Sequence, residues 1–158
     1  VPYLRSLNLD NLLFASPDVG GVKRTRSFAQ HFNSEMVVID KQRKKANEVA
    51  EMTIIGNVEG KNVVLVDDLV DTGGTLCKAA KIIMEQGAKS VRAVCTHPVL
   101  SGNAYENINN SVLDELVVSD SIPLQQQSDK IRVLTVAELF AKAIDNVTSD
   151  GSISQLFI

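Results

Sequence analysis

Short apolar runs alternate with polar segments along the whole chain, and their spacing predicts alternating strands and helices. Runs rich in β-branched residues are typical of strands buried on both faces, whereas apolar positions three and four residues apart indicate one face of a helix. The pattern predicts strands at 11–15, 36–39, 62–66, 90–95, 113–118 and 131–134, with a short extended piece at 53–55. It predicts helices at 3–7, 21–32, 75–86, near 103–109 and at 136–146.

This alternation favours a single α/β domain over residues 1–158. The expected architecture is a three-layer sandwich in which helices cover both faces of a mainly parallel sheet, with right-handed crossovers. A length of 158 residues is sufficient for one domain with a sizeable core. The loop-like stretch at 125–129 is expected to be a surface excursion rather than a linker between domains.

Composition narrows the class of protein without defining it. Hydrophobic residues make up 44% of the chain and charged residues 22%, as in an ordinary globular domain. A net charge of −3 gives no general attraction to nucleic acid, and no apolar run has the roughly 20 residues that a membrane span needs. Cys77 and Cys95 lack metal-ligand spacing, and two reduced thiols are favoured over a disulfide. We therefore expect a cytoplasmic protein without nucleic-acid or membrane partners.

The clearest chemical signal is the stretch Asn62–Thr75, NVVLVDDLVDTGGT. An apolar strand ends at two adjacent acids, Asp67 and Asp68, and a tight turn then opens a helical pattern. Ligands of open α/β sheets bind at the carboxyl ends of strands, and helix amino termini favour anions. Glycine N–H groups can approach a phosphate closely, threonine hydroxyls can donate to it, and neighbouring carboxylates can hold sugar hydroxyls or a divalent cation.

The candidate ligand-binding residues of this turn are Asp71, Thr72, Gly73, Gly74 and Thr75. The structural alternative is an ordinary strand–turn–helix junction in which Asp71 or Thr72 is the N-cap. The register of the paired acids, the turn and the preceding apolar strand favours a binding function over that alternative.

This loop resembles the ribose-5-phosphate loop of type I phosphoribosyltransferases and of phosphoribosyl pyrophosphate (PRPP) synthetases, the ribose-phosphate diphosphokinases. Further segments resemble the synthetases in the same order: SPDVGGVK at 16–23, DKQRKKANEVAEM at 40–52, GNVEGK at 56–61, THPVLSG at 96–102 and the ending SISQLFI. Synthetases have two similar halves, and the resemblance is to the second. It therefore implies that this chain is a C-terminal domain whose covalent partner is an N-terminal half.

The resemblance implies a transferase that moves diphosphate from ATP to ribose 5-phosphate, giving PRPP and AMP. It implies Mg²⁺ as cofactor, ATP as cosubstrate and a homo-oligomeric, often hexameric, assembly. Such phosphoryl chemistry depends on positioning, metal and cationic stabilisation rather than on a covalent nucleophile. In the family the N-terminal half carries a metal-binding histidine and much of the adenine pocket, so this domain alone is expected to be inactive.

The resemblance also assigns roles to residues outside the loop. Lys41 and Arg43 would clamp the β- and γ-phosphates, although a run of charges taken alone would favour a solvated loop. Asp18 would be a magnesium ligand, and its alternative role is that of N-cap for the following helix. Asp67 and Asp68 would contribute to ribose 5-phosphate binding.

The ending of the chain resembles a regulatory phosphate or ADP site formed by Ser152, Ser154 and Phe157. The alternative is a strand-like terminus with incidental serines. His31 is expected to be structural, and His97 is expected to be packed or hydrogen-bonded rather than catalytic.

Two other functions compete with the synthetase interpretation. A phosphoribosyltransferase would share the loop at 71–75, consume PRPP and release pyrophosphate in the presence of a nucleobase. A non-catalytic, synthetase-associated subunit would keep the fold without the chemistry. The presence of Asp18, Lys41, Arg43 and Asp67 argues against the second alternative.

The predicted helix 136–146 carries one apolar stripe, formed by Val136, Leu139, Phe140, Ala143 and Ile144. In the family, the corresponding helix packs against the N-terminal half. We therefore expect an interface element, the alternative being a helix that folds onto the domain's own sheet.

Overall fold

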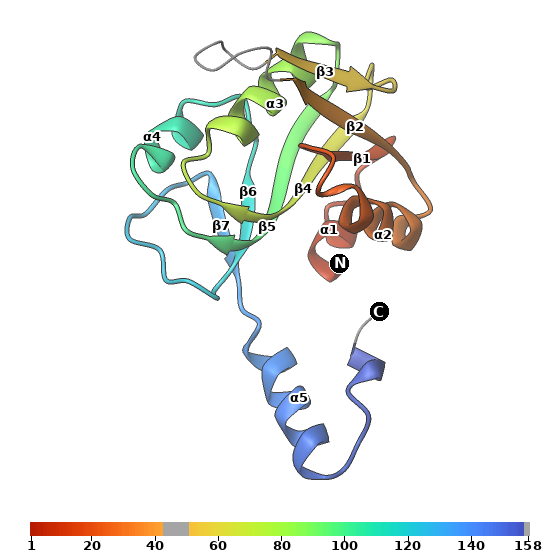
Figure 1. Cartoon of the computed structure of the whole chain (residues 1–158), viewed down its shortest axis with the longest axis vertical. Coiled ribbons are helices and arrows are strands. Elements are labelled where there is room, and N and C mark those ends of the chain that lie inside the picture. The colour runs from red at the N-terminus through yellow and green to blue at the C-terminus, as the bar shows by residue number, and fades with distance from the viewer. Residues whose placement is uncertain (43–50, 157–158) are drawn as a thin grey trace.

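A single twisted sheet organises the computed structural model, which describes residues 1–42 and 51–156 (Figure 1). In the described part of the chain the strands lie in the order β3-β2-β1-β4-β5-β6-β7. Their bounds are β1 Leu12–Ser16, β2 Glu35–Gln42, β3 Glu51–Ile55, β4 Asn62–Val70, β5 Ser90–Pro98, β6 Leu116–Ser119 and β7 Ile131–Leu134. The helices are α1 Pro2–Ser6, α2 Val22–Phe32, α3 Gly74–Glu85, α4 Ala104–Asn109, α5 Ala137–Thr148 and the 3₁₀ helix η1 Ser154–Leu156.

All neighbouring strands are parallel except β2 and β3, which pair antiparallel at one edge. The edge pair aligns Val38 with Ile55 and Lys41 with Met52. The prediction of a mainly parallel α/β sheet is confirmed. Because the carboxyl ends of parallel strands meet at one edge, residues distant in sequence gather there.

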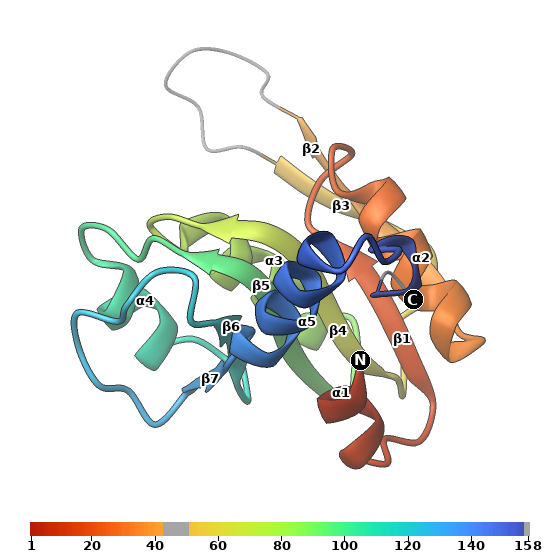
Figure 2. The same ribbon diagram turned by 90° about the horizontal axis from the view of Figure 1, so that it is seen from below.

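Helices cover both faces of the sheet and create two cores (Figures 1 and 2). Phe14, Val64 and Val66 face the side of α1 and α2, where Phe14 packs between Phe28 and Phe32 at 5.8 and 5.2 Å between ring centroids. The other core holds the alternate strand residues together with α3 and α4; its largest fully buried members include Leu13, Ile39, Leu65, Ile83, Ile108, Leu113 and Leu116. The three-layer prediction is therefore confirmed.

The central strands run further than the apolar pattern predicts. β4 reaches Val70 and β5 reaches Pro98, because their ladder continues through the pair Leu69–His97. Asp67 and Asp68 consequently lie inside β4 and not beyond its end, so their side chains point to opposite faces of the sheet. Conversely, β6 begins at Leu116 and is shorter than the predicted strand 113–118.

The last helix does not fold onto the sheet. Figure 1 shows α5 extending away from the sheet, with η1 folded back beside it. None of the described side chains of α5 is buried, and Leu139 and Phe140 are 48% and 62% exposed. The alternative in which this helix packs on its own domain is wrong, whereas its role as an interface stays a prediction.

In the described ranges, no helix combines the length and apolar character needed to cross a bilayer. Both cysteines are free thiols, Cys77 on α3 and Cys95 on β5. Burial raises the pKa of Cys95 to about 12, so this thiol stays protonated at neutral pH.

Candidate phosphate-binding site

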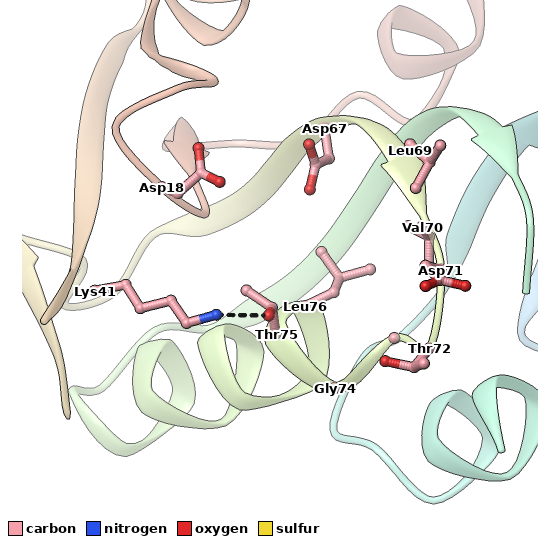
Figure 3. Close-up of a pocket in the computed structure, with 11 residues that line it drawn as sticks. Asp18, Lys41, Asp67, Leu69, Val70, Asp71, Thr72, Gly74, Thr75 and Leu76 are labelled. Atoms are coloured by element: carbon pink, nitrogen blue, oxygen red, sulfur yellow. Dashed lines mark hydrogen bonds between the residues drawn. The ribbon is translucent and has the colours of Figure 1, made fainter. Parts of the chain in front are cut away.

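A cavity of about 210 Å³ opens at the carboxyl end of β4, beside the first turn of α3 (Figure 3). It is lined by Asp18, Lys41, Asp67 and the continuous stretch 69–76. The β1–α2 connection, β2, β4 and the turn before α3 each contribute to this lining. Tertiary structure thus brings together most of the residues that the sequence singled out: Asp18, Lys41, Asp67, Asp71, Thr72, Gly73, Gly74 and Thr75.

The turn before α3 depends on Gly73, which adopts a left-handed conformation with φ of 73°. A Cβ at this position would also meet Ile108 Cγ1 at 3.5 Å. Gly73 is the N-cap of α3 and provides no side-chain cap, so neither Asp71 nor Thr72 caps the helix as the structural alternative required. No acidic residue lies in the first helical turn. The positive end of the helix dipole therefore faces the cavity, and no carboxylate of the first helical turn neutralises it.

Lys41 brings a cation to this helix terminus from the opposite side of the cavity. Its Nζ donates to Thr75 Oγ1 at 3.1 Å, an interaction between β2 and the first turn of α3 (Figure 3). The ammonium group and the helix terminus together favour an anion in the cavity. Arg43, the second predicted clamp residue, lies outside the described residues.

The two adjacent acids of β4 have different surroundings. Asp67 lines the cavity, while Asp68 lies outside its lining and accepts a hydrogen bond from Arg24 Nη2 at 2.6 Å. Arg24 Nη1 also lies 3.8 Å from Asp67 Oδ1. The sequence gives no sign of this role of Arg24, because its partners lie more than forty positions away and other basic residues surround it in the helix.

These surroundings separate the acidities of the pair. Burial, together with the neighbouring Asp68 and Asp18 carboxylates, raises the pKa of Asp67 to about 6. Partial desolvation opposes ionisation of Asp68, yet Arg24 and hydrogen bonds from Asp67 and the backbone hold the pKa of Asp68 below its ordinary value. The pair therefore holds one carboxyl group that changes charge near pH 6, Asp67, and one whose pKa lies below its ordinary value, Asp68.

Asp18 holds the connection before α2 and borders the cavity, but it is not the N-cap of that helix, because Gly21 occupies the N-cap position without a side-chain cap hydrogen bond. Asp18 Oδ1 accepts the Gly21 N–H at 2.9 Å at the start of α2, and its carboxylate also lines the cavity on the same side as Asp67 (Figure 3). Ser16 Oγ donates to the Asp18 carbonyl at 2.6 Å, which fixes the turn. A Cβ on Gly21 would lie only 2.8 Å from that hydroxyl, so a larger residue at this position would displace the Ser16 side chain.

The fit of a metal ion can be judged from these carboxylates. The described part of the chain contains no group of three or more His, Cys, Asp or Glu side chains arranged to hold a metal. Asp18 and Asp67 nevertheless direct two carboxylates towards one cavity. Mg²⁺ commonly binds one or two carboxylates and completes its shell with water and substrate phosphates, so this pair fits magnesium held jointly with a phosphorylated ligand.

The remaining candidates lie away from the cavity lining. Ser152 Oγ and Ser154 Oγ are 2.8 Å apart in the segment that follows α5, and Phe157 lies outside the described residues. His97 Nδ1 is 3.0 Å from Ser121 Oγ, and the His31 ring meets the edge of Phe32. Both histidines have the packed or hydrogen-bonded environments that the sequence predicted.

The fold and the anion-favouring loop define a type I phosphoribosyltransferase-like α/β domain. A purine phosphoribosyltransferase from Pyrococcus horikoshii shares this fold, with a TM-score of 0.55 and 22% identity over 85% of this chain and 80% of that one. The sequence profile of the phosphoribosyl synthetase-associated domain matches residues 34–158. The chain belongs to this family.

Two individual proteins illustrate the relationship. The chain is 52% identical over 156 residues to the ribose-phosphate pyrophosphokinase of Campylobacter jejuni, covering 99% of this chain and 50% of that protein. The crystal structure of phosphoribosylpyrophosphate synthetase from Mycobacterium smegmatis matches with a TM-score of 0.82 and 30% identity, over 90% of this chain and 46% of that one. The chain therefore spans about half the length of the relatives it matches.

The raised pKa of Asp67 predicts that ionisation of this carboxyl group lowers the stability of the folded protein. Because the folded-state pKa of about 6 exceeds the ordinary 3.8, the folded protein loses stability as pH rises through this window, and the loss persists above it. We expect the free energy of unfolding of the Asp67→Asn variant at pH 7.5 to be higher than that of the wild type by on the order of 1 kcal/mol, after allowance for solvent screening. Near pH 4 the two free energies should differ little. Urea unfolding at both pH values measures this difference.

The control is Asp10→Asn, remote from the site. The Lys89 hydrogen bond lowers the pKa of Asp10. Removal of the Asp10 charge should therefore not raise the free energy of unfolding at pH 7.5. An Asp67→Asn effect of equal size at both pH values would contradict the electrostatic cost.

Proposed function

We propose that this chain is the C-terminal, ribose 5-phosphate-binding domain of a ribose-phosphate pyrophosphokinase, whose covalent partner is an N-terminal half. The observation that carries the proposal is the cavity in which the Gly73 turn, an uncapped helix terminus, Lys41 and Asp67 meet. The family membership and the similarity to half of several such enzymes support it. The complete enzyme would convert ribose 5-phosphate and ATP into PRPP and AMP.

The phosphate of ribose 5-phosphate would bind in the turn before α3. Backbone N–H groups of Gly73, Gly74 and Thr75 and the hydroxyls of Thr72 and Thr75 would donate to its oxygens. Asp67, ionised above about pH 6, would accept hydrogen bonds from ribose hydroxyls. Asp68 would contribute from the other side of β4, where it holds Arg24.

In the chemical step, the C1 hydroxyl oxygen of the ribose forms a bond to the β-phosphorus of ATP. The bond between that phosphorus and the bridging oxygen on the α-phosphate breaks, AMP leaves with the electron pair, and the hydroxyl proton is lost to solvent. Lys41 and Arg43 would stabilise the charge on the transferring diphosphate. Lys41 would release Thr75 and move its ammonium to the phosphates, because a charged acceptor forms the stronger hydrogen bond.

Asp18 and Asp67 would hold Mg²⁺ together with substrate phosphates, and the bound ion would neutralise negative charge on the transferring group. The protein residues position the two substrates and exclude competing orientations.

The partners of the domain follow from the same proposal. Ribose 5-phosphate and ATP are the small-molecule partners, with neither nucleic acid nor a membrane involved, in a homo-oligomer of the cytoplasm. The exposed apolar stripe of α5 would pack against the N-terminal half. Ser152, Ser154 and Phe157 would belong to a regulatory phosphate or ADP site completed by other parts of the assembly.

The isolated chain should bind ribose 5-phosphate without producing AMP from ATP. The phosphate turn is present, whereas the rest of the ATP site would lie in the other half. Calorimetry with ribose 5-phosphate, and chromatography of mixtures with ATP and Mg²⁺, measure the two parts. Gly73→Ala should weaken binding at least tenfold, because the left-handed conformation disfavours any Cβ.

Gly60→Ala is the matched control. Gly60 also has a positive φ, 67°, and is remote from the cavity, so the substitution strains the backbone without touching the site. Absence of ribose 5-phosphate binding by the wild-type chain would refute the proposed function. AMP formation would refute the division of the active site, and nucleobase-dependent release of pyrophosphate from PRPP would indicate a phosphoribosyltransferase instead.

Lys41→Ala, introduced into an enzyme that joins this chain to an N-terminal half, should lower kcat on the order of a hundredfold or more while changing ribose 5-phosphate affinity only modestly. Contacts formed mainly in the transition state behave in this way. Steady-state kinetics and direct binding separate the two effects. A kcat within a few-fold of wild type would show that Lys41 is only structural; Arg43→Ala is expected to behave as Lys41→Ala does.

The α5 stripe should make the isolated chain self-associate as concentration rises. Phe140 is 62% exposed and lies next to further exposed apolar residues of the helix, including Leu139, Ile144 and Val147. Phe140→Asp should restore the monomer in sedimentation velocity experiments, while Ala141→Asp, on the neighbouring exposed position, should not. A wild-type chain that stays monomeric at high concentration would contradict this prediction.

A further inference from the structure

The turn before α3, residues 70–73, is held in shape by a segment that does not line the cavity. Residues 100–107, between β5 and the end of α4, approach the turn from the side of α4, and α3 and α4 are neighbours (Figure 1). Three successive carbonyls of the turn each accept a hydrogen bond from this segment. Leu100 N–H donates to Val70 O at 3.0 Å and Ser101 N–H donates to Asp71 O at 3.1 Å.

The third of these carbonyls is held by a side chain. Asn107 Nδ2 donates to Thr72 O at 2.9 Å. Ser101 Oγ also donates to the Asp71 carboxylate, so the turn is held through side chains at two positions. Asn107 is therefore the residue whose side chain determines the orientation of the peptide between Thr72 and Gly73.

A peptide plane transmits this orientation to the cavity. The C=O and N–H of a trans peptide point in opposite directions, and no cis peptide occurs in the described residues. When Asn107 holds the Thr72 carbonyl on the α4 side, the Gly73 N–H is directed away from α4. The cavity lies on that other side of the turn, because Thr72 and Gly73 line it while Asn107 does not.

Asn107 is itself held in place from α3. The backbone carbonyl of Asn107 accepts a weak hydrogen bond from Cys77 Sγ at 3.5 Å. Cys77 N–H donates to Gly73 O at 2.9 Å in the first bond of α3. Asn107, the Thr72–Gly73 peptide and the first turn of α3 thus form a closed set of contacts, and glycine at position 73 permits the φ that this closure requires.

We propose that Asn107 is a positioning residue of the phosphate-binding turn: its amide fixes the Thr72–Gly73 peptide so that the Gly73 N–H donates to a phosphomonoester. This inference rests on the proposed function of the same turn. It adds a residue of α4 that contacts neither the ligand nor the reacting atoms. The ligand class is a phosphomonoester or free phosphate, because the positioned donor is directed at phosphate oxygens and not at the sugar.

The test measures binding of ribose 5-phosphate and of inorganic phosphate to the full chain by calorimetry, with the Gly73 amide resonance followed by NMR. Asn107→Ala should weaken both ligands about three- to tenfold, as expected for the loss of one hydrogen bond, and should reduce the shift of the Gly73 amide on phosphate binding. Asn107→Gln keeps an amide donor on a half-buried side chain and should restore affinity to within about twofold of wild type, because the same type of donor is available.

Asn110→Ala is the matched control, since Asn110 is the exposed C-cap of α4 and makes no contact with the turn before α3 that the structure records. It should leave both affinities and the Gly73 shift unchanged, and thermal unfolding of each variant verifies that it is folded. If the wild-type chain binds and the Asn107→Ala variant binds both ligands with the same affinity, the inference is overturned while the proposed function stands. Equal weakening by Asn107→Ala and Asn110→Ala would also overturn it, because the effect would then be general to α4. Failure of the wild-type chain to bind either ligand would refute both proposals.

Discussion

The central strand β4 is buried on both faces, and this burial fixes its register and the position of the candidate site. Val63 and Leu65 face one core while Val64 and Val66 face the other, and these four side chains are at most 1% exposed. A strand held in this way has almost no freedom to slip, because a shift of one residue would exchange the two faces. The carboxyl end of β4, from Asp67 to the turn at Gly73, therefore has a fixed position relative to β1, β5 and α3.

The site at this end of the strand gathers charge that the fold must tolerate. Asp18, Asp67 and Asp68 lie near one another, and part of the repulsion is relieved by Arg24 and part by the raised pKa of Asp67. Opposite these acids stand the Lys41 ammonium and the uncapped amino terminus of α3. A phosphate group would complement the ammonium and the helix terminus, and hydroxyl groups would complement the carboxylates. A divalent cation would reduce the repulsion among the acids.

The cavity and the apolar stripe of α5 occupy separate parts of the molecule. The cavity residues are supported by the sheet and by α3, whereas α5 lies outside both cores and leaves large apolar side chains exposed. Under the proposed function, binding of a phosphorylated sugar would use the packed domain, whereas assembly would use the projecting helix. This separation allows the two properties to be tested by independent substitutions.

The α/β class, the mainly parallel sheet and most of the cavity lining can be predicted from the sequence alone. β-Branched runs identify strands buried on both faces, and the turn chemistry at Asp71–Thr75 marks a strand–loop–helix junction within one continuous stretch. Such local patterns can be recognised because the residues that act together are neighbours in the chain. The left-handed turn at Gly73 is of this kind, since glycine accepts that backbone conformation without steric cost.

The contacts between side chains that are distant in the sequence cannot be predicted in this way. The extension of β4 to Val70 separated Asp67 from Asp68, packing of α2 brought Arg24 to that pair, and α4 brought Asn107 to the Thr72 carbonyl. In the structure α5 also lies away from the sheet. Its apolar periodicity does not predict this position, because the same stripe suits packing within a domain or between domains. These contacts join positions tens of residues apart, and their geometry arises from the packing of whole elements, which no local pattern of residues encodes.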